Sequence, residues 1–200
     1  MQGIKNKYYK YIIAVIMYVF ICFIFCITYN SKNEMDCFSI GDILMFFFRG
    51  ERINRELSKN VFPSPVYMII QMLMAYIVGN YCYRDFKERA RYVVIRSGNR
   101  CNWFASKIMW AEFSITTAYI LMFGVVCVCC MLNVHGEISM RIHQSVISNV
   151  CNLGEITVDM SEIILNITLV PYIIQICIAI IQISLELLFN PMISYIIVMA

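Results

Sequence analysis

Four long apolar stretches dominate this 200-residue sequence, and a strongly basic loop separates the second stretch from the third. The stretches cover residues 11–29, 66–83, 108–132 and 163–185. A helix needs about 20 apolar residues to cross the roughly 30 Å hydrocarbon core of a bilayer, so we expect each stretch to span it. A fifth apolar stretch begins at residue 191 and ends with the sequence, and we expect the natural protein to continue. The sequence therefore predicts an all-α, polytopic membrane helical bundle with at least four full spans and a fifth begun.

The composition agrees with a membrane protein. Hydrophobic residues make up 60% of the chain and charged residues 14%, whereas soluble domains are about 45–50% apolar and about 25% charged. A soluble domain of this length has too little interior to hide so much apolar surface. We expect residues 1–200 to form a single transmembrane domain in the lipid bilayer, with no nucleic-acid partner.

The charges of the connecting segments predict the orientation, because cytoplasmic loops are enriched in Lys and Arg. The segment before the first span carries three lysines and no acidic residue, and residues 84–107 carry seven basic residues against two acidic ones. On the opposite side, residues 30–65 have no net charge and residues 133–162 have a net charge of −3. We therefore expect the N-terminus and loop 84–107 in the cytoplasm. The apolar segment 43–48 is too short to span, and we expect it to form a small helix at the outer interface.

Loop 84–107 contains a short amphipathic pattern. Phe86, Ala90, Val93 and Val94 share one face of a helix, and charged residues occupy the other face. A basic amphipathic helix at the inner membrane surface either docks a partner protein or lies on anionic headgroups. Charge alone leaves both interpretations open.

The sequence contains no motif for nucleotide binding or catalysis. It lacks a G-x-x-x-x-G-K-[ST] loop and a dinucleotide glycine fingerprint, so we expect no bound cofactor and assign any ATP to partner subunits. His135 and His143 both lie in the outer loop, where we expect them to be exposed to solvent. Two such ligands are too few for a metal site, and we expect neither a metal nor a catalytic residue.

The ten cysteines form no clear metal or disulfide pattern. Six of them fall within predicted spans, where Cys behaves as a small apolar residue. Cys127, Cys129 and Cys130 are close in sequence but lack a nearby His or further Cys for a tetrahedral site. Cys37 and Cys151 fall on the predicted outer side, where a disulfide is permitted, and the sequence leaves their pairing open.

Polar side chains within an apolar span are costly and therefore informative. In the fourth stretch, residues at spacings of four, three and four form one stripe: Gln175, Ala179, Gln182 and Glu186. This stripe either packs against a neighbouring helix or lines a translocation path, and packing is the commoner role. In the second stretch, Gln71, Ala75 and Gly79 form a small and polar ridge that favours close helix approach, within the chain or against a second copy.

Residues 81–107 combine an acidic residue after the second span with an Ile-Arg-x-Gly-x-Arg-x-x-Trp-x-x-x-Lys pattern. The residues that carry it are Asp85, Ile95, Arg96, Gly98, Arg100, Trp103 and Lys107. This segment resembles the first cytoplasmic loop of bacterial type 2 ATP-binding-cassette permeases. The resemblance extends more loosely through residues 11–200, including the segment 42–48.

The resemblance implies six helices per subunit, a homodimer or a heterodimer with a second permease, and a cytoplasmic ATP-binding-cassette ATPase as partner. It implies that the loop helix couples the permease to the ATPase, through Asp85, Phe86, Arg89, Arg91, Arg96 and Arg100. The substrate path would then include Gln175, Gln182 and Glu186. We expect a permease subunit of an ATP-driven exporter in the bacterial cytoplasmic membrane, moving a peptide, antibiotic or lipid-like cargo by alternating access, and not itself an enzyme.

Two other classes of protein stay open. A substrate-binding membrane component of an uptake system would show a compact outward-facing pocket and helix surfaces rich in small residues. An intramembrane enzyme would need a nucleophile and a base together, whereas the sequence places both histidines outside and Cys82 and Cys101 inside.

Overall fold

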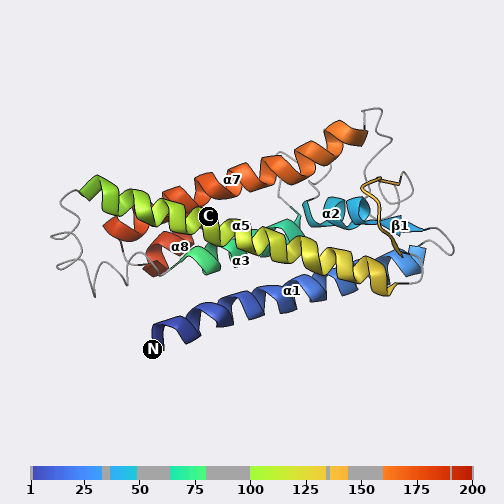
Figure 1. Cartoon of the computed structure of the whole chain (residues 1–200), viewed down its shortest axis with the longest axis horizontal. Helices are drawn as coiled ribbons and strands as arrows, with labels where there is room; N and C mark the ends of the chain where they lie inside the picture. The colour runs from blue at the N-terminus through green and yellow to red at the C-terminus, as the bar shows by residue number, and fades with distance from the viewer. Residues whose placement is uncertain are drawn as a thin grey trace, which may run out of the picture. The chain divides into compact units, whose positions relative to one another are not determined.

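The computed structural model describes residues 2–32, 37–48, 64–79, 100–133, 136–143, 160–189 and 191–199. Its helices in chain order are α1 (Gln2–Lys32), α2 (Ile40–Phe48), α3 (Pro65–Val78), α5 (Arg100–Leu132), α7 (Met160–Leu188) and α8 (Pro191–Met199) (Figure 1). Two strands of two residues each, β1 (Phe38–Ser39) and β2 (Gly136–Glu137), pair in parallel. The described residues are therefore almost entirely helical, as predicted, apart from a strand pair that no sequence pattern indicates.

Among the described residues, three helices are long and apolar enough to cross a membrane. Their membrane-length segments are Tyr8–Asn30, Cys101–Leu132 and Leu165–Leu188, which correspond to the first, third and fourth predicted spans. The described part of the second predicted span, 66–83, is the 14-residue helix α3, and its last residues lie outside the described ranges. The fifth stretch is the nine-residue helix α8. The second and fifth spans thus stay predictions.

Helix α5 begins eight residues before the third predicted span. The segment from Arg100 to Lys107 contains no Gly or Pro, so nothing in it interrupts the helical backbone. Within it the Ser106 hydroxyl donates to the Trp103 carbonyl at 2.7 Å, and the Lys107 ammonium lies 5.6 Å from the centre of the Trp103 ring. The last residues of the basic loop therefore form the first turns of a membrane-length helix.

The chain divides into two compact units. Unit 1 comprises residues 1–70 and 120–171, and unit 2 comprises residues 71–119 and 172–200. Helices α3, α5 and α7 each contribute residues to both units. The single transmembrane domain expected from the sequence stays a prediction.

In unit 1, α2 packs against the C-terminal part of α1 and against β1 (Figure 1). Phe25 of α1 is the centre of this contact, with its ring 5.4 Å from that of Phe46 and 5.6 Å from that of Phe38. Both pairs have the edge-to-face geometry that aromatic rings favour. The small helix predicted over 43–48 is confirmed as a helix, although it starts at Ile40 and is buried along its length. Apart from Asp42 this helix is apolar on every face, and such a helix is expected to be buried.

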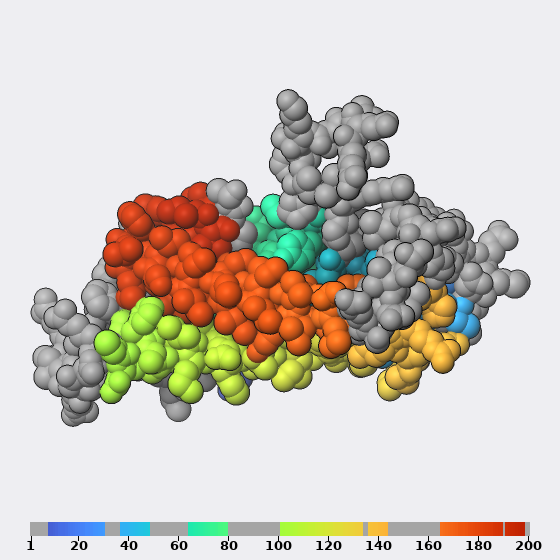
Figure 2. Space-filling view, turned by 90° about the horizontal axis from the view of Figure 1, so that it is seen from above, coloured from blue at the N-terminus to red at the C-terminus, as the bar shows by residue number. Residues whose placement is uncertain are grey.

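In unit 2, α7 packs against the N-terminal half of α5. The Tyr172 hydroxyl lies 2.8 Å from the Thr116 hydroxyl, and its ring lies edge-on to Tyr119 at 5.2 Å. Figure 2 shows the C-terminal part of α7 (orange) lying along the first turns of α5 (green). Helix α8 folds back on α7, where the Ser194 hydroxyl donates to the Gln182 carbonyl at 3.1 Å.

Candidate functional site

The coupling residues implied by the resemblance fall largely outside the described part of the chain. Asp85, Phe86, Arg89, Arg91 and Arg96 all precede residue 100 and are not among the described residues. Arg100 is the first residue of α5. The coupling helix therefore stays a prediction.

The polar stripe of α7 lies on a buried face within unit 2. Gln175, Gln182 and Glu186 are each only 1% exposed, and Ala179 between them is 2% exposed. Exposed apolar residues such as Ile181 occupy the remaining surface of the helix. The spacing prediction that these residues share one protein-facing stripe is confirmed.

Gln182 links α7 to α3. Its Nε2 atom donates to the backbone carbonyl of Ala75 at 3.0 Å and lies 3.4 Å from Oε1 of Glu186. The same Ala75 carbonyl accepts the backbone N–H of Gly79 at 2.8 Å, so both lone pairs of this oxygen are used. Gln182 thus makes a helix-packing contact, the commoner of the two roles considered for the stripe, and its place in a substrate path stays a prediction.

Gly79 allows this close contact between α3 and α7. A Cβ atom at position 79 would lie 2.9 Å from the Ala75 carbonyl oxygen, 2.9 Å from Gln182 Nε2 and 3.5 Å from Glu186 Oε1. Two of these distances are shorter than real Cβ contacts, so a methyl group at position 79 would displace the Gln182 amide from its contact with the Ala75 carbonyl. The close approach predicted for the ridge of Ala75 and Gly79 is confirmed within a single chain.

The same helices also bury amide atoms that have no hydrogen-bond partner among the described residues. These atoms are Gln71 Oε1, Gln175 Nε2 and Gln182 Oε1. Such atoms are rare in native proteins, because leaving a buried polar group unbonded costs about 1–3 kcal/mol. The Gln182 amide donates to the backbone of α3 and so links two helices. The buried Nε2 atom of Gln175 has no acceptor among the described residues.

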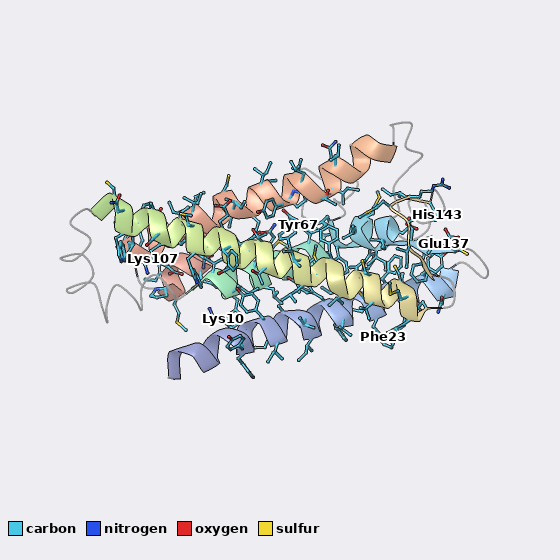
Figure 3. All side chains as sticks on the ribbon, viewed as in Figure 1. Lys10, Phe23, Tyr67, Lys107, Glu137 and His143 are labelled. Carbon is cyan, nitrogen blue, oxygen red and sulfur yellow. The ribbon has the colours of Figure 1, made fainter. Side chains whose placement is uncertain are left out.

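A second polar cluster, centred on the fully buried carboxylate of Asp42, lies in unit 1. Oδ1 accepts the backbone N–H of His143 at 2.8 Å, and Oδ2 lies 2.7 Å from His143 Nδ1. Oδ2 also accepts the backbone N–H of Ser39 at 2.9 Å. Figure 3 shows His143 beside α2, the helix that carries Asp42.

Ser39 and Asp42 bond reciprocally at the start of α2. The Asp42 backbone N–H donates to Ser39 Oγ at 3.3 Å, while Asp42 Oδ2 accepts from Ser39 N. This is a capping box in which Asp takes the place of the usual Glu or Gln. The Ser39 hydroxyl also contacts the backbone carbonyl of Arg141. Asp42 therefore fixes both the start of α2 and the backbone at His143.

The contact with Asp42 orients the His143 ring. The side chain is 34% exposed, and because Nδ1 faces the carboxylate, Nε2 is the nitrogen left for acid–base chemistry or ligand contact. This corrects the expectation that His143 is a solvent-exposed loop residue. Sequence reasoning missed the pair because its members are 101 residues apart and no local spacing joins them. His135 lies outside the described residues.

Two cysteines from different helices lie close together. Cys26 of α1 lies beside Cys129 of α5, with 3.9 Å between the two sulfur atoms. Cys129 therefore has a further Cys nearby that the sequence spacing did not indicate. Within the described ranges, no group of three or more Cys, His, Asp or Glu residues is arranged to hold a metal ion. Cys37 is exposed, and Cys151 lies outside those ranges.

The two polar clusters described above thus differ in character. The α3–α7 cluster in unit 2 consists of amides and one carboxyl group, whereas the Asp42 cluster in unit 1 contains a titratable imidazole. No family model, curated protein or solved structure significantly matches this chain.

Proposed function

We propose that this chain is a membrane-spanning permease subunit of an ATP-driven exporter. The membrane-length helices and the basic loop 84–107 support this function. The buried polar stripe of α7 is the observation that supports the proposal most strongly. Polar and ionisable groups within membrane helices are costly, and those that face the protein interior commonly mark the path of a substrate or ion.

The two glutamines of the stripe have different roles in this proposal. Gln182, together with Gly79, holds α7 against α3, so it belongs to the frame of the path. Gln175 has a buried amide donor that no described residue accepts, so it is the first candidate for contact with cargo. In alternating access, a residue that lines the path changes its hydrogen-bond partners between two states. A donor without an acceptor in one state can therefore bind an acceptor in the other.

The partners follow from the same proposal. ATP is bound and hydrolysed by a separate cytoplasmic ATPase, which pushes on the helix from Asp85 to Arg96. Two permease subunits, identical or different, enclose a path for a peptide, antibiotic or lipid-like cargo. The subunit lies in a bacterial cytoplasmic membrane with its N-terminus inside.

Co-purification tests the partnership. We expect the charge reversals Arg89→Glu and Arg91→Glu, made together, to abolish recovery of the ATPase with the tagged chain, because they invert the charge of the loop helix. The matched control reverses Lys5 and Lys7, which share the predicted cytoplasmic side but not the loop. ATPase recovery equal to wild type in the loop variant would contradict the proposal and favour a loop that binds only lipid headgroups.

The Asp42–His143 pair favours a second candidate, an intramembrane enzyme that uses acid–base chemistry. A carboxylate that orients an imidazole is a common arrangement for activating a nucleophile. Unit 1 also contains thiols, since Cys26 and Cys129 lie in it. If His143→Ala abolishes the protein's cellular activity and the loop charge reversal does not, the enzyme is favoured. If the loop charge reversal abolishes that activity and His143→Ala does not, the permease is favoured.

A further inference from the structure

Two thiols meet at the C-terminal ends of α1 and α5. Cys26 and Cys129 come from different helices, 103 residues apart in sequence, and their sulfur atoms are 3.9 Å apart. Both side chains are half-buried, and both lie near the ends of their predicted spans, where a reagent at the membrane surface can approach them. A disulfide has an S–S distance of about 2.05 Å, so closing one here requires a shift of roughly 2 Å.

An amide group adjoins both sulfur atoms. Asn133, just beyond the end of α5, holds its side chain by donating from Nδ2 to the Cys129 carbonyl at 3.0 Å. The same nitrogen lies 3.5 Å from the Cys26 sulfur and 3.8 Å from the Cys129 sulfur. The Asn133 amide is therefore closer to Cys26 than to Cys129, and it can donate a hydrogen bond to a thiolate that forms on either sulfur during thiol–disulfide exchange.

We propose that Cys26 and Cys129 are the site of a reversible disulfide that ties the end of α1 to the end of α5. The orientation predicted from loop charges puts these helix ends at the outer membrane surface, the side on which disulfides persist. This bridge is distinct from a pairing of Cys37 with Cys151, because each pair joins different parts of the chain.

The oxidant is a disulfide, either of low molecular weight or on a thiol oxidoreductase. The Cys26 thiolate attacks one sulfur of this disulfide, forming a mixed disulfide and releasing one thiolate. The Cys129 thiolate then attacks the Cys26 sulfur and releases the second thiolate. The two protons lost by Cys26 and Cys129 end on the two released thiols, so the donor disulfide is reduced by two electrons as the Cys26–Cys129 bond forms.

One neighbouring thiol competes for the same partner. Cys22 lies one turn before Cys26 on α1 and also interacts with Cys129. Cys22 is buried and lies one turn deeper in the predicted span, whereas Cys26 is half-buried and nearer the outer end of the span. The bridge therefore forms with Cys26 and not with Cys22.

The experiment uses the full chain in native membrane vesicles treated with oxidised glutathione. After denaturation, a large maleimide reagent counts the remaining thiols, and peptide mapping by mass spectrometry identifies the linked pair. All variants carry Cys37→Ser, which removes the other candidate bridge on the outer side. We expect the parent to lose two of its reactive thiols to one bond between the Cys26 and Cys129 peptides.

Three variants test the assignment. In Cys129→Ser we expect the reaction to stop at a glutathione adduct on Cys26, and in the control Cys177→Ser we expect the bridge to form as in the parent. We expect Asn133→Ala to slow the bridge, and an unchanged rate would overturn its part in stabilising the thiolate. A Cys22–Cys129 link in the parent, or no link after saturating oxidant, would overturn the proposal. The parent is mapped directly, so this outcome does not depend on how any test variant folds.

Discussion

The Nδ1 atom of His143 lies 2.7 Å from a carboxylate oxygen of Asp42, although the two residues are 101 positions apart in the sequence. The parallel pairing of β1 with β2 brings their segments together, with Ser39 opposite Glu137. Gly41 permits the contact, since a Cβ atom there would lie 2.7 Å from the carbonyl oxygen of Arg141. The buried carboxylate thus fastens the segment after β2 to the start of α2.

Replacing this carboxylate should destabilise the protein. In Asp42→Ala, the backbone N–H groups of Ser39 and His143 lose their acceptor in a buried site, which costs about 1–3 kcal/mol for each unbonded group. We expect a loss of roughly 3 kcal/mol, measured by thermal unfolding in detergent. His143→Ala should cost less, because the backbone N–H of residue 143 still donates to Asp42.

Glu137→Gln is the matched control for this prediction. Glu137 is an exposed carboxylate in β2, and exposed substitutions of this kind change stability by about 0.5 kcal/mol or less. Equal melting temperatures for Asp42→Ala and Glu137→Gln would show that Asp42 does not fasten the segment.

The two glycines in α5 and at the end of α3 should respond in opposite ways to added bulk. Gly79→Ala places a methyl group against Ala75 and Gln182, and overpacking of this kind typically costs about 1–3 kcal/mol. Gly124→Ala meets nothing within 4 Å and should be neutral or slightly stabilising, because Ala favours a helix over Gly by about 1 kcal/mol. Thermal unfolding of both variants measures the difference. Equal tolerance at the two positions would refute the close approach of α3 to α7.

Leucine substitutions separate packing from pathway in the polar stripe. Gln182→Leu removes the hydrogen bond to Ala75 and should lower stability by about 1 kcal/mol, the scale of interhelical hydrogen bonds in membranes. Export by the Gln182→Leu variant should persist, because Gln182 holds the helices together and does not contact cargo.

Gln175→Leu should show the reverse. It removes a buried donor that no described residue accepts, so stability should hold or rise while export is lost. Thermal unfolding and a transport assay on the same preparation measure both effects. Full export by Gln175→Leu would remove Gln175 from the proposed path.

Thiol labelling tests the orientation. Cys37 and Cys101 are both exposed within the protein, so each can react if the reagent reaches its side of the membrane. A membrane-impermeant reagent added outside intact cells should label a variant that retains only Cys37 and not one that retains only Cys101. Outside labelling of Cys101 would reverse the predicted topology, including the cytoplasmic loop.

The length of the apolar stretches predicted the three membrane-length helices, and helical periodicity predicted the buried stripe. The 3.6-residue period placed Gln175, Gln182 and Glu186 on one face, and all three are buried together. The apolar run at 43–48 predicted a helix, but its start at Ile40 depends on the capping bonds of Ser39 and Asp42. Such boundaries depend on local hydrogen bonds that hydrophobicity does not report.

The sequence did not predict the two long-range pairs, because no periodic spacing relates their members. Asp42 meets His143, and Cys26 meets Cys129, across more than 100 residues. Each contact depends on how two elements are brought together by tertiary packing. From sequence alone, Asp42 was only part of a loosely matching segment, and Cys26 was only a small apolar residue of a span.

Photo-crosslinking from the loop helix tests the proposed function most directly. A photoreactive phenylalanine analogue at position 86 in living cells should form an adduct with an ATPase that carries a G-x-x-x-x-G-K-[ST] motif, because Phe86 lies on the apolar face of the proposed coupling helix. The same analogue at Ile12, an exposed position of α1, should form adducts with lipid. Adducts of position 86 with lipid alone would contradict the permease account.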